Sequence, residues 1–238
     1  YCLEYCFVFQ SKDGGFHYNQ AGINRGLERQ SANFKLLQDC EIPTQFYGRT
    51  FYQIFPDRFY NKNPELSPKE GQIKAHGHYS KLRDWAQKPL EYLQGYCLDY
   101  FGGDLPGIEY KLNYLSDLGV NGVYLNPIFE APTHHKYDCQ DYYKVDPYLG
   151  GDEALINLSR SCQQLDTKLM LDISVNHTGI THDWKNSKPN FYHKTEGGIH
   201  RWAGVDTLLT LDYENDDVHR TIYSGSDSVL KHWLKEPF

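Results

Sequence analysis

A carboxylate, an amide and an imidazole gather at the end of one apolar segment, in the order Asp172, Asn176 and His177. The segment from Lys168 to Gly179 is short, rich in Leu, Ile and Val, and bounded by polar residues, which is typical of a fully buried strand. In α/β barrels the active site lies at the C-terminal ends of the parallel strands. A lone Asp or His more often caps a helix or is satisfied within the core, but three such residues together favour a site.

The composition is compatible with a cleft that binds sugars. Aromatic residues make up 15% of the chain, with 20 Tyr and 4 Trp. Their faces stack on the apolar C–H faces of sugar rings, although they serve equally well in a rigid core or a protein interface. The net charge of −7, without a Lys/Arg cluster, argues against nucleic acid or an anionic membrane as a partner. No apolar run reaches about 18 residues, the length that would indicate a membrane span.

The cysteines are scattered and form no C-x-x-C pair. They are Cys2, Cys6, Cys40, Cys97, Cys139 and Cys162. This spacing argues against a zinc site and resembles reduced cytosolic thiols more than a disulfide framework. Because the chain begins at Tyr1 rather than Met, we expect the natural N-terminus to be missing, and the absence of a signal peptide excludes nothing.

The elements that must position the candidate residues alternate in type after a β-rich start. Residues 1–40 predict strands over 1–9, from 16 onward and over 34–37, and residues 43–48 predict a linker. Further strands are predicted over 51–56, 120–125 and 168–179, and helices over 108–118, from Asp152 through Leu155, Leu158, Cys162 and Leu165, and from Asp216 or Asp217 to Leu234. Residues 60–100 are loop-like, and a loop this long is usually functional or an insertion.

Alternating strands and helices predict a parallel α/β sheet with right-handed crossovers. Long loops follow the C-terminal ends of the strands, as in a (β/α)₈ barrel. Three βα units are too few to close a barrel, and two or three strands cannot bury a core alone. We therefore expect an α/β fold made of a partial (β/α)₈ TIM barrel (its first three βα units), preceded by the end of an N-terminal β-sandwich domain.

Five motifs then occur in a fixed order along the chain. They are Tyr52-Gln-Ile-Phe-Pro-Asp57-Arg-Phe59, Phe101-Gly-Gly-Asp-Leu-Pro-Gly-Ile108, Leu118-Gly-Val with Tyr124-Leu-Asn-Pro127, His135-Lys-Tyr-Asp138 and Asp172-Ile-Ser-Val-Asn176-His177. Together they resemble the α-amylase family of glycoside hydrolases, on the branch of neopullulanases, cyclomaltodextrinases and bacterial maltodextrin glucosidases. Tyr5-Cys-Phe7, Leu211-Asp-Tyr213 and Lys231-His-Trp-Leu-Lys-Glu-Pro237 most resemble the maltodextrin glucosidases.

The resemblance implies a fold, a domain order and a reaction. Residues 1–45 would end an N-terminal β-sandwich, and residues 46–238 would begin the barrel, with 178–213 as the loop called domain B after the third strand. The reaction would be retaining hydrolysis of α-1,4-glucosidic bonds in maltodextrins, which needs a carboxylate nucleophile and a carboxylic acid. By resemblance, both lie beyond Phe238, so the chain is expected to be an N-terminal fragment that is inactive alone.

The resemblance also assigns roles to residues of the substrate cleft. Tyr137 would stack on the sugar at the bond-cleaving position, Asp138 would accept hydrogen bonds from that sugar's hydroxyls, and His177 would bind the same sugar. Asp172 would hold an arginine beside the nucleophile through a charge-assisted pair, and Asn176 would support the site. We expect three other aspartates to cap helices or fix turns: Asp104, Asp141 and Asp146.

Relatives of this kind can bind calcium in the long first loop, with oxygen ligands that a hard cation prefers. The matching positions are Asn61, Asn63, Gly102 and Asp104, but Leu66 and Ser67 stand at the positions further along the loop. With so few anionic ligands, we expect no metal and no other cofactor.

The resemblance further implies a maltodextrin substrate, a cytoplasmic location and a homodimer formed through the N-terminal domain. Within the same class, a neopullulanase or cyclomaltodextrinase remains an alternative. An alternative of another class is a non-catalytic, amylase-like module that binds glucan or a protein partner.

Overall fold

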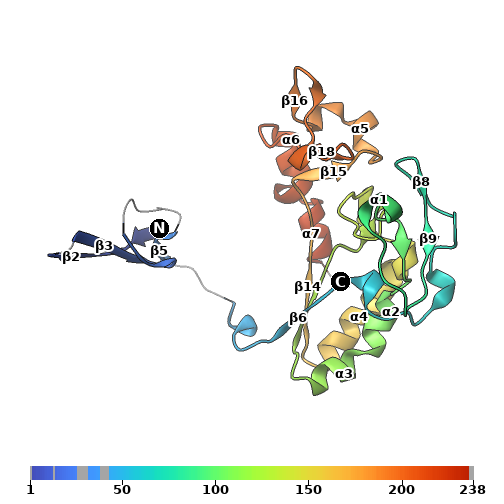
Figure 1. Cartoon of the computed structure of the whole chain (residues 1–238), viewed down its shortest axis with the longest axis horizontal. Coiled ribbons are helices and arrows are strands. Elements are labelled where there is room, and N and C mark those ends of the chain that lie inside the picture. The colour runs from blue at the N-terminus through green and yellow to red at the C-terminus, as the bar shows by residue number, and fades with distance from the viewer. Residues whose placement is uncertain (1, 13, 26–31, 38–42, 236–238) are drawn as a thin grey trace. The chain divides into compact units, whose positions relative to one another are not determined.

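The computed structural model describes residues 2–12, 14–25, 32–37 and 43–235, and it divides into two compact units, Tyr1–Tyr47 and Gly48–Phe238 (Figure 1). Cys40, one of the six cysteines, lies outside the described residues. Cys97, Cys139 and Cys162 are free thiols.

The N-terminal unit is built from short antiparallel strands. β1 (Cys2–Tyr5) pairs with β5 (Phe34–Leu37), and β2 (Phe7–Ser11), β3 (Gly14–Asn19) and β4 (Gly22–Asn24) form a second sheet in sequential order. The single strand predicted over residues 1–9 is wrong: the chain changes pairing partner after Tyr5, which splits the strand at Cys6. β4 was not predicted. An aromatic cluster of Tyr5, Phe7, Tyr18 and Phe34 joins the two sheets, with ring centroids 5.3–6.0 Å apart.

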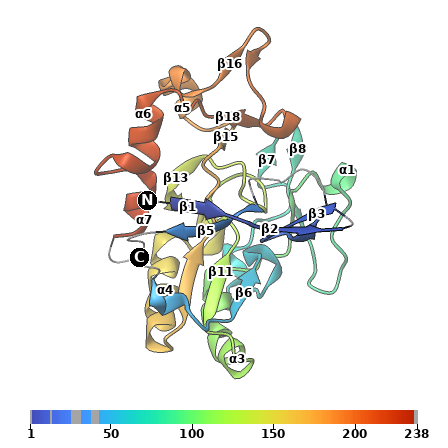
Figure 2. The same ribbon diagram turned by 90° about the vertical axis from the view of Figure 1, so that its left-hand side faces the viewer.

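A three-stranded parallel sheet lies at the centre of the second unit, in the order β14–β11–β6. Its strands are β6 (Phe51–Ile54), β11 (Gly122–Leu125) and β14 (Lys168–Leu171), and Ile54, Leu125 and Leu171 lie side by side in register. Figure 2 shows β6 and β11 running together, which confirms the predicted parallel order. The third strand was predicted too long. It ends at Leu171, and the chain re-enters β structure as β15 (His177–Gly179), which pairs with β18 (Leu208–Thr210) instead.

The helices that follow the strands cover one face of this sheet. The predicted helix over 108–118 is two helices, α2 (Leu105–Tyr110) and α3 (Leu112–Asp117), and it starts earlier because Asp104 caps it by accepting from the Gly107 amide at 2.6 Å. The N-cap of α4 (Gly151–Gln164) is Gly150, not Asp152 as predicted. Asp152 instead accepts from the Val145 amide at 2.8 Å.

The core lies between these helices and the sheet. It includes Val123 and Leu125 from the sheet and Ile108, Leu155 and Leu158 from the helices, all of them buried. Cys162 is buried as predicted, whereas Leu165 is exposed because α4 ends at Gln164. The opposite face of the sheet carries Gln53, Tyr124 and Met170 in one row and is less covered, with Met170 39% exposed.

The connections after the strands contain short elements of their own. After β6 come β7 (Lys74–Ala75), β8 (His78–Tyr79), β9 (Lys81–Leu82), α1 (Tyr92–Gly95) and β10 (Asp99–Tyr100). After β11 come β12 (Phe129–Glu130) and β13 (Asp141–Val145), and after β14, between β15 and β18, come α5 (Trp184–Ser187), β16 (Lys194–Thr195) and β17 (Gly198–Ile199).

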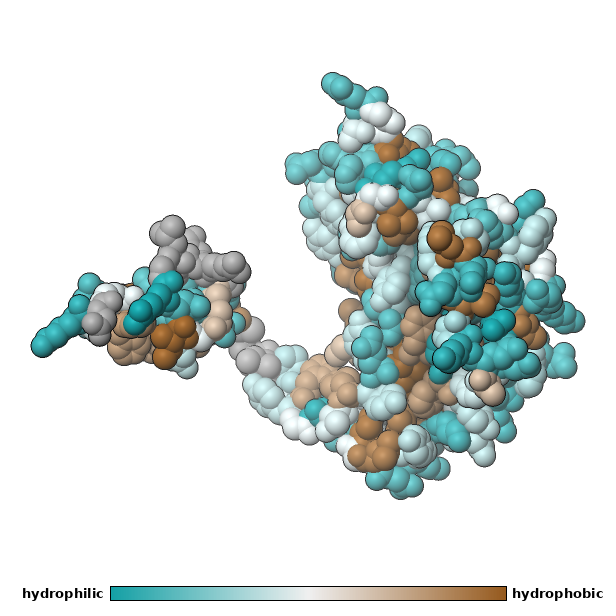
Figure 3. Space-filling model, viewed as in Figure 1, coloured by the Kyte–Doolittle hydropathy of each residue, from teal (hydrophilic) through white to brown (hydrophobic). Residues whose placement is uncertain are grey.

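The last helix, predicted as one element over 216–234, is interrupted. α6 (Asp216–His219) is capped by Asn215 and runs into a π turn over Arg220–Ser224, and α7 (Val229–Trp233) follows a break at Gly225. The Gly225 amide donates to the Arg220 carbonyl at 2.9 Å and closes the first piece. Among the described residues, no helix combines the length and apolar character needed to cross a bilayer. Figure 3 shows apolar and hydrophilic residues interspersed on the visible face of this unit.

Candidate functional site

A cavity of about 740 Å³ opens at the C-terminal end of the sheet. Its lining comes from four parts of the chain: the β7–β8 hairpin with α1, the 133–138 loop after β11, the 172–177 segment after β14, and residues 202–208 before β18. All five residues predicted to bind substrate or support the site line it, namely Tyr137, Asp138, Asp172, Asn176 and His177. The described cavity is of a size and aromatic character common for small-molecule sites.

A chain of hydrogen bonds fixes the hydroxyl group of Tyr137 above the sheet. Gln53 Nε2 donates to Asn126 Oδ1 at 2.9 Å, and Asn126 Nδ2 donates to the Tyr137 hydroxyl at 3.1 Å. The hydroxyl in turn donates to Asp172 Oδ2 at 2.8 Å. Asn126 and Asp172 stand just beyond β11 and β14, where their amides continue the ladder to Ile54 and Leu125. Burial and the bond to Asp172 raise the pKa of Tyr137 to about 12, so the phenol keeps its proton at neutral pH.

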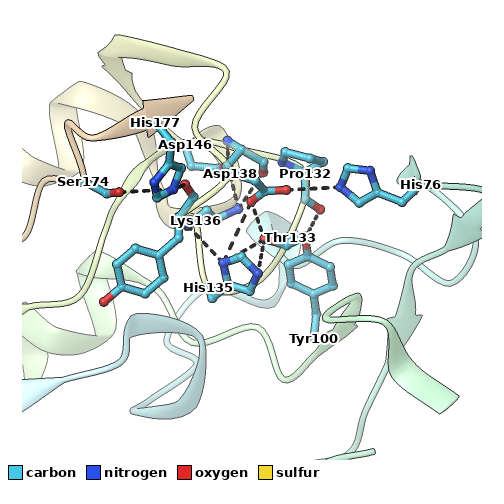
Figure 4. Close-up of polar contacts among 12 residues, drawn as sticks. His76, Tyr100, Pro132, Thr133, His135, Lys136, Asp138, Asp146, Ser174 and His177 are labelled. Atoms are coloured by element: carbon cyan, nitrogen blue, oxygen red, sulfur yellow. Dashed lines mark hydrogen bonds and ion pairs between the residues drawn. The ribbon is translucent and has the colours of Figure 1, made fainter. Parts of the chain in front are cut away.

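Asp138 is a buried carboxylate, only 1% exposed, at the floor of the cavity. Thr133 donates to its Oδ1, and His76 Nε2 lies 3.4 Å from its Oδ2. Burial raises the pKa of Asp138, but the hydrogen bonds from His76 and Thr133 outweigh it and hold the pKa below its ordinary value. The group is therefore ionised. Figure 4 shows His76 reaching Asp138 from one side, with His177 and Ser174 on the other.

His177 is a buried, neutral imidazole whose hydrogen bonds fix its tautomer. Its Nε2 donates to the Tyr137 carbonyl at 3.0 Å, and the Asn176 amide donates to its Nδ1 at 2.7 Å. Burial lowers the pKa of His177, so the ring stays uncharged at neutral pH. Its face packs against Trp202, with centroids 4.7 Å apart. His177 thus ties the 172–177 segment to the loop that carries Tyr137 and Asp138.

A buried ion pair holds Lys136 in the loop that carries Tyr137 and Asp138. Lys136 Nζ lies 2.6 Å from Asp146 Oδ2 and donates to the Ala131 carbonyl at 3.1 Å, and both charged side chains are 2% exposed. Lys136 has a φ of 61°, in the left-handed region that non-glycine residues rarely adopt. With the lysine turned inward, the neighbouring Tyr137 and Asp138 are directed into the cavity.

Of the three aspartates predicted to cap helices or fix turns, Asp104 and Asp146 cap helices, whereas Asp141 is the first residue of the strand β13. Asp104 caps α2, Asp146 Oδ1 accepts from the Tyr148 amide at 2.9 Å, and Asp141 Oδ1 accepts from the Tyr143 amide at 2.8 Å. Asp146 also pairs with Lys136, which was not predicted.

The weak calcium candidates cluster in the loop after β6 but are engaged with protein groups. Asp104 accepts from the Asn63 amide at 2.8 Å as well as from Gly107, and burial raises its pKa. The side-chain amide of Asn61 donates through Nδ2 to Ser67 Oγ at 2.9 Å. The Gly102 amide donates to Asp57. In the described ranges, no group of three or more His, Cys, Asp or Glu side chains is arranged to hold a metal ion.

Several residues of the site were not predicted from the sequence. His76, Thr133 and Trp202 contact Asp138 or His177, and Asn126 and Gln53 extend the hydrogen bonds of Tyr137. Asn126 belongs to the Tyr124–Pro127 motif and directly follows a strand, so its place in the site could have been predicted from the sequence. His76 and Trp202 lie in long segments without helical or strand periodicity, where residue spacing does not predict a site.

Comparisons with known proteins agree on one family. The family model described as alpha amylase, catalytic domain, matches residues 53–201. The intracellular maltogenic amylase of Bacillus subtilis (strain 168) is 30% identical over 98% of this chain and 40% of its own length. The cyclomaltodextrinase of Geobacillus thermopakistaniensis (strain MAS1) is 43% identical over 74% of this chain and 29% of its own length.

A solved structure agrees with them. The ligand-free cyclic alpha-maltosyl-(1→6)-maltose hydrolase of Arthrobacter globiformis superposes with a TM-score of 0.63 and 30% identity, over 78% of this chain and 42% of that one. The chain thus spans 40% of the length of the first of these curated relatives.

Proposed function

The chain belongs to the alpha-amylase family of glycoside hydrolases, and on that premise we propose that it forms one side of the substrate site of a retaining enzyme that cleaves α-1,4-glucosidic bonds in maltodextrins. The observation that carries the proposal is the group around Tyr137. A fixed aromatic ring, an ionised carboxylate (Asp138) and a neutral imidazole (His177) line one cavity. Such a site combines stacking on a sugar's C–H face with hydrogen bonds to its hydroxyls.

Each residue has a role in this proposal. Tyr137 stacks on the sugar, Asp138 accepts from its hydroxyls, and His177 contacts the same sugar. Asp172 holds an arginine next to the nucleophile through a charge-assisted hydrogen bond, and its contact with Tyr137 couples the two positions. Asn176 supports the site by fixing the tautomer of His177.

The two carboxylates of the cavity are proposed to bind and orient rather than to attack. The retaining route requires a nucleophile and an acid roughly 5–5.5 Å apart. Asp138 is buried among Thr133 and His76, and Asp172 is bonded to Tyr137. We therefore propose that the catalytic pair lies outside these residues, and that the chain carries a substrate-binding part.

The finer assignments are also proposals. Residues 1–45 would end a β-sandwich domain through which two copies dimerise, and residues 178–213 would be domain B of the barrel that begins at residue 46. The relative from Bacillus subtilis is named intracellular, which supports a cytoplasmic location. Specificity of the maltodextrin glucosidase type rests on the sequence motifs alone.

A cyclomaltodextrinase is the second candidate, and one observation favours it. The relative with that name is 43% identical over 74% of the chain, whereas the maltogenic amylase is 30% identical over 98% of it. The two candidates differ in whether cyclic substrates are opened faster than linear ones.

The test is hydrolysis by the complete protein of maltotriose, pullulan and β-cyclodextrin, followed by product analysis. Release of glucose or maltose from maltotriose is expected, and fastest turnover of the cyclic substrate would select the second candidate. In the same protein, His177→Ala should lower kcat more than it raises KM, because its contact strengthens in the transition state. Absence of hydrolysis on all three α-glucans would overturn the proposal.

A further inference from the structure

The loop between β6 and α2 contributes a second group of aromatic residues to the cavity. His78, Tyr92 and Tyr96 line it together with His76, and none of them belongs to the motifs from which the family was identified. His76 approaches the Asp138 carboxylate from the side opposite to His177 (Figure 4).

This part of the loop is a structured wall. β7 and β8 form a hairpin whose two connecting residues, His76 and Gly77, both have positive φ, at 53° and 83°, as the tightest hairpin turns require. Ser80 closes the hairpin by exchanging hydrogen bonds with Ile73 and by donating one to the Lys69 carbonyl, all at 2.8–3.0 Å.

The wall is also anchored to the rest of the unit. Lys81 Nζ donates to the Gln94 carbonyl at 2.8 Å and ties the hairpin to α1. β9 pairs in parallel with β10, and a small apolar cluster of Ala75, Leu98 and Tyr100 supports both.

Two rings of the wall form a stacked aromatic surface, in which each ring covers one face of the other. The His78 and Tyr96 rings lie face to face, with an interplanar angle of 8°, and Tyr92 meets Tyr96 edge-on with centroids 5.8 Å apart. Tyr96 and Cys97 are consecutive non-glycine residues with positive φ, at 50° and 60°. Such strain persists only where the surrounding structure enforces it, and it is concentrated at functional sites.

The polar groups beside this surface are those that bind hydroxyls. Asp138 and His135 line the same cavity as this surface and Tyr137. Trp202, which packs on His177, also lines this cavity. A cavity lined by aromatic side chains from separate segments and by a buried carboxylate suits a ligand of several linked rings, each with an apolar face and hydroxyl edges.

We propose that His78, Tyr92 and Tyr96 form an additional sugar-binding subsite that holds a second or third glucosyl unit and makes binding depend on chain length. The inference rests on the proposed function, and it adds residues that determine specificity for longer α-glucans. The stacked His78–Tyr96 pair supplies the flat apolar face, and Tyr92, which is 66% exposed, extends it toward solvent.

The experiment is calorimetric binding of sulfur-linked maltooligosaccharides of two to five units, which resist hydrolysis, to the complete protein and its variants. Tyr96→Ala should weaken binding of the tetramer and pentamer about 5- to 10-fold and change that of the dimer less than about twofold. Tyr96→Trp should retain the affinity for long ligands. Tyr79→Ala is the matched control, since Tyr79 is exposed on the same hairpin but does not line the cavity.

The outcomes separate the two proposals. Equal loss for all lengths, or no loss for the long ligands, overturns the subsite while leaving the proposed function intact. Wild-type protein that binds none of the ligands overturns both. If Tyr96→Ala lowers the melting temperature, Tyr92→Ala replaces it, because an exposed ring can be removed without disturbing the wall, and the same length dependence is expected.

Discussion

The hydroxyl group of Tyr137 donates to the carboxylate of Asp172 at 2.8 Å, joining residues that lie 35 positions apart in the sequence. The first follows β11 and the second follows β14, so the bond links two neighbouring strand ends across the top of the sheet. It holds the tyrosine by its edge, which leaves a face of the ring available for a sugar.

Two substitutions of Tyr137 distinguish the contribution of its hydroxyl group from that of its aromatic ring. Tyr137→Phe removes two hydrogen bonds, the one donated to Asp172 and the one accepted from Asn126, which should cost about 0.5–1.5 kcal/mol of stability each, with a mild effect on turnover. Tyr137→Ala also removes the stacking surface and should lose about 1–3 kcal/mol of transition-state stabilisation, measured as kcat/KM on maltotriose. Tyr114→Ala, an exposed residue on α3, serves as the control. Unchanged turnover in Tyr137→Ala would assign the ring to the core.

The buried ion pair of Lys136 and Asp146 should stabilise the fold only while both charged partners are present. Lys136→Met leaves the Asp146 carboxylate buried without its cation, and loss of one partner from a buried pair typically costs about 3–5 kcal/mol. Adding Asp146→Asn should recover part of this loss, as shown by urea unfolding of the single and double variants. Lys144→Ala removes a lysine from an exposed pair with Asp141 and should leave the unfolding midpoint unchanged. Additive effects of the two buried substitutions would contradict this interpretation.

The sequence was sufficient to predict the three parallel strands and their order, because each is a short apolar run between turn-forming residues. Where β14 ends could not be predicted, since Ile173 and Val175 continue the apolar pattern beyond Leu171. The end is set by pairing: β14 pairs with β11 as far as Leu171, and the chain then pairs with β18 from His177 onward.

Part of the candidate site was likewise predictable. Tyr137, Asp138 and His177 lie in short motifs next to strands, and the structure places them on one cavity. His76 and Trp202 could not be predicted, because a hairpin and a long excursion bring them in from segments without periodicity. Their positions depend on tertiary contacts such as the β9–β10 pairing and the packing of Trp202 on His177.

The buried histidines predict how stability changes with pH. Burial lowers the pKa of both His135 and His182 from 6.5 to about 4. Between pH 6.5 and about 4, each of these histidines is protonated in the unfolded chain but neutral in the folded chain. Their contribution to the free energy of unfolding is therefore fully present above about pH 6.5 and falls as the pH decreases toward 4. The slope should be up to about 1.4 kcal/mol per pH unit for each histidine. Asp138, whose pKa is lowered, adds a loss in the same direction only at still lower pH.

Urea unfolding at several pH values checks this dependence. His182→Asn keeps an acceptor for the Trp184 amide, which His182 Nδ1 binds at 3.1 Å, and should reduce the slope between pH 6.5 and 4. Above pH 7 the variant and the wild type should show parallel curves. A slope that is unaffected by the substitution would mean that His182 does not remain neutral in the folded protein.

The last prediction concerns catalysis by these 238 residues alone. Of the described residues that line the cavity, Asp138 and Asp172 carry carboxylates. Asp138 is 1% exposed and bonded to Thr133 and His76, and Asp172 accepts from Tyr137. Neither arrangement offers a free nucleophile facing an acid at the roughly 5–5.5 Å that the retaining route requires. Residues 1–238 should therefore release no reducing sugar from maltotriose under conditions in which the complete protein does. Turnover by residues 1–238 that disappears in Asp172→Asn would place the catalytic pair within them and would refute the roles proposed for both aspartates.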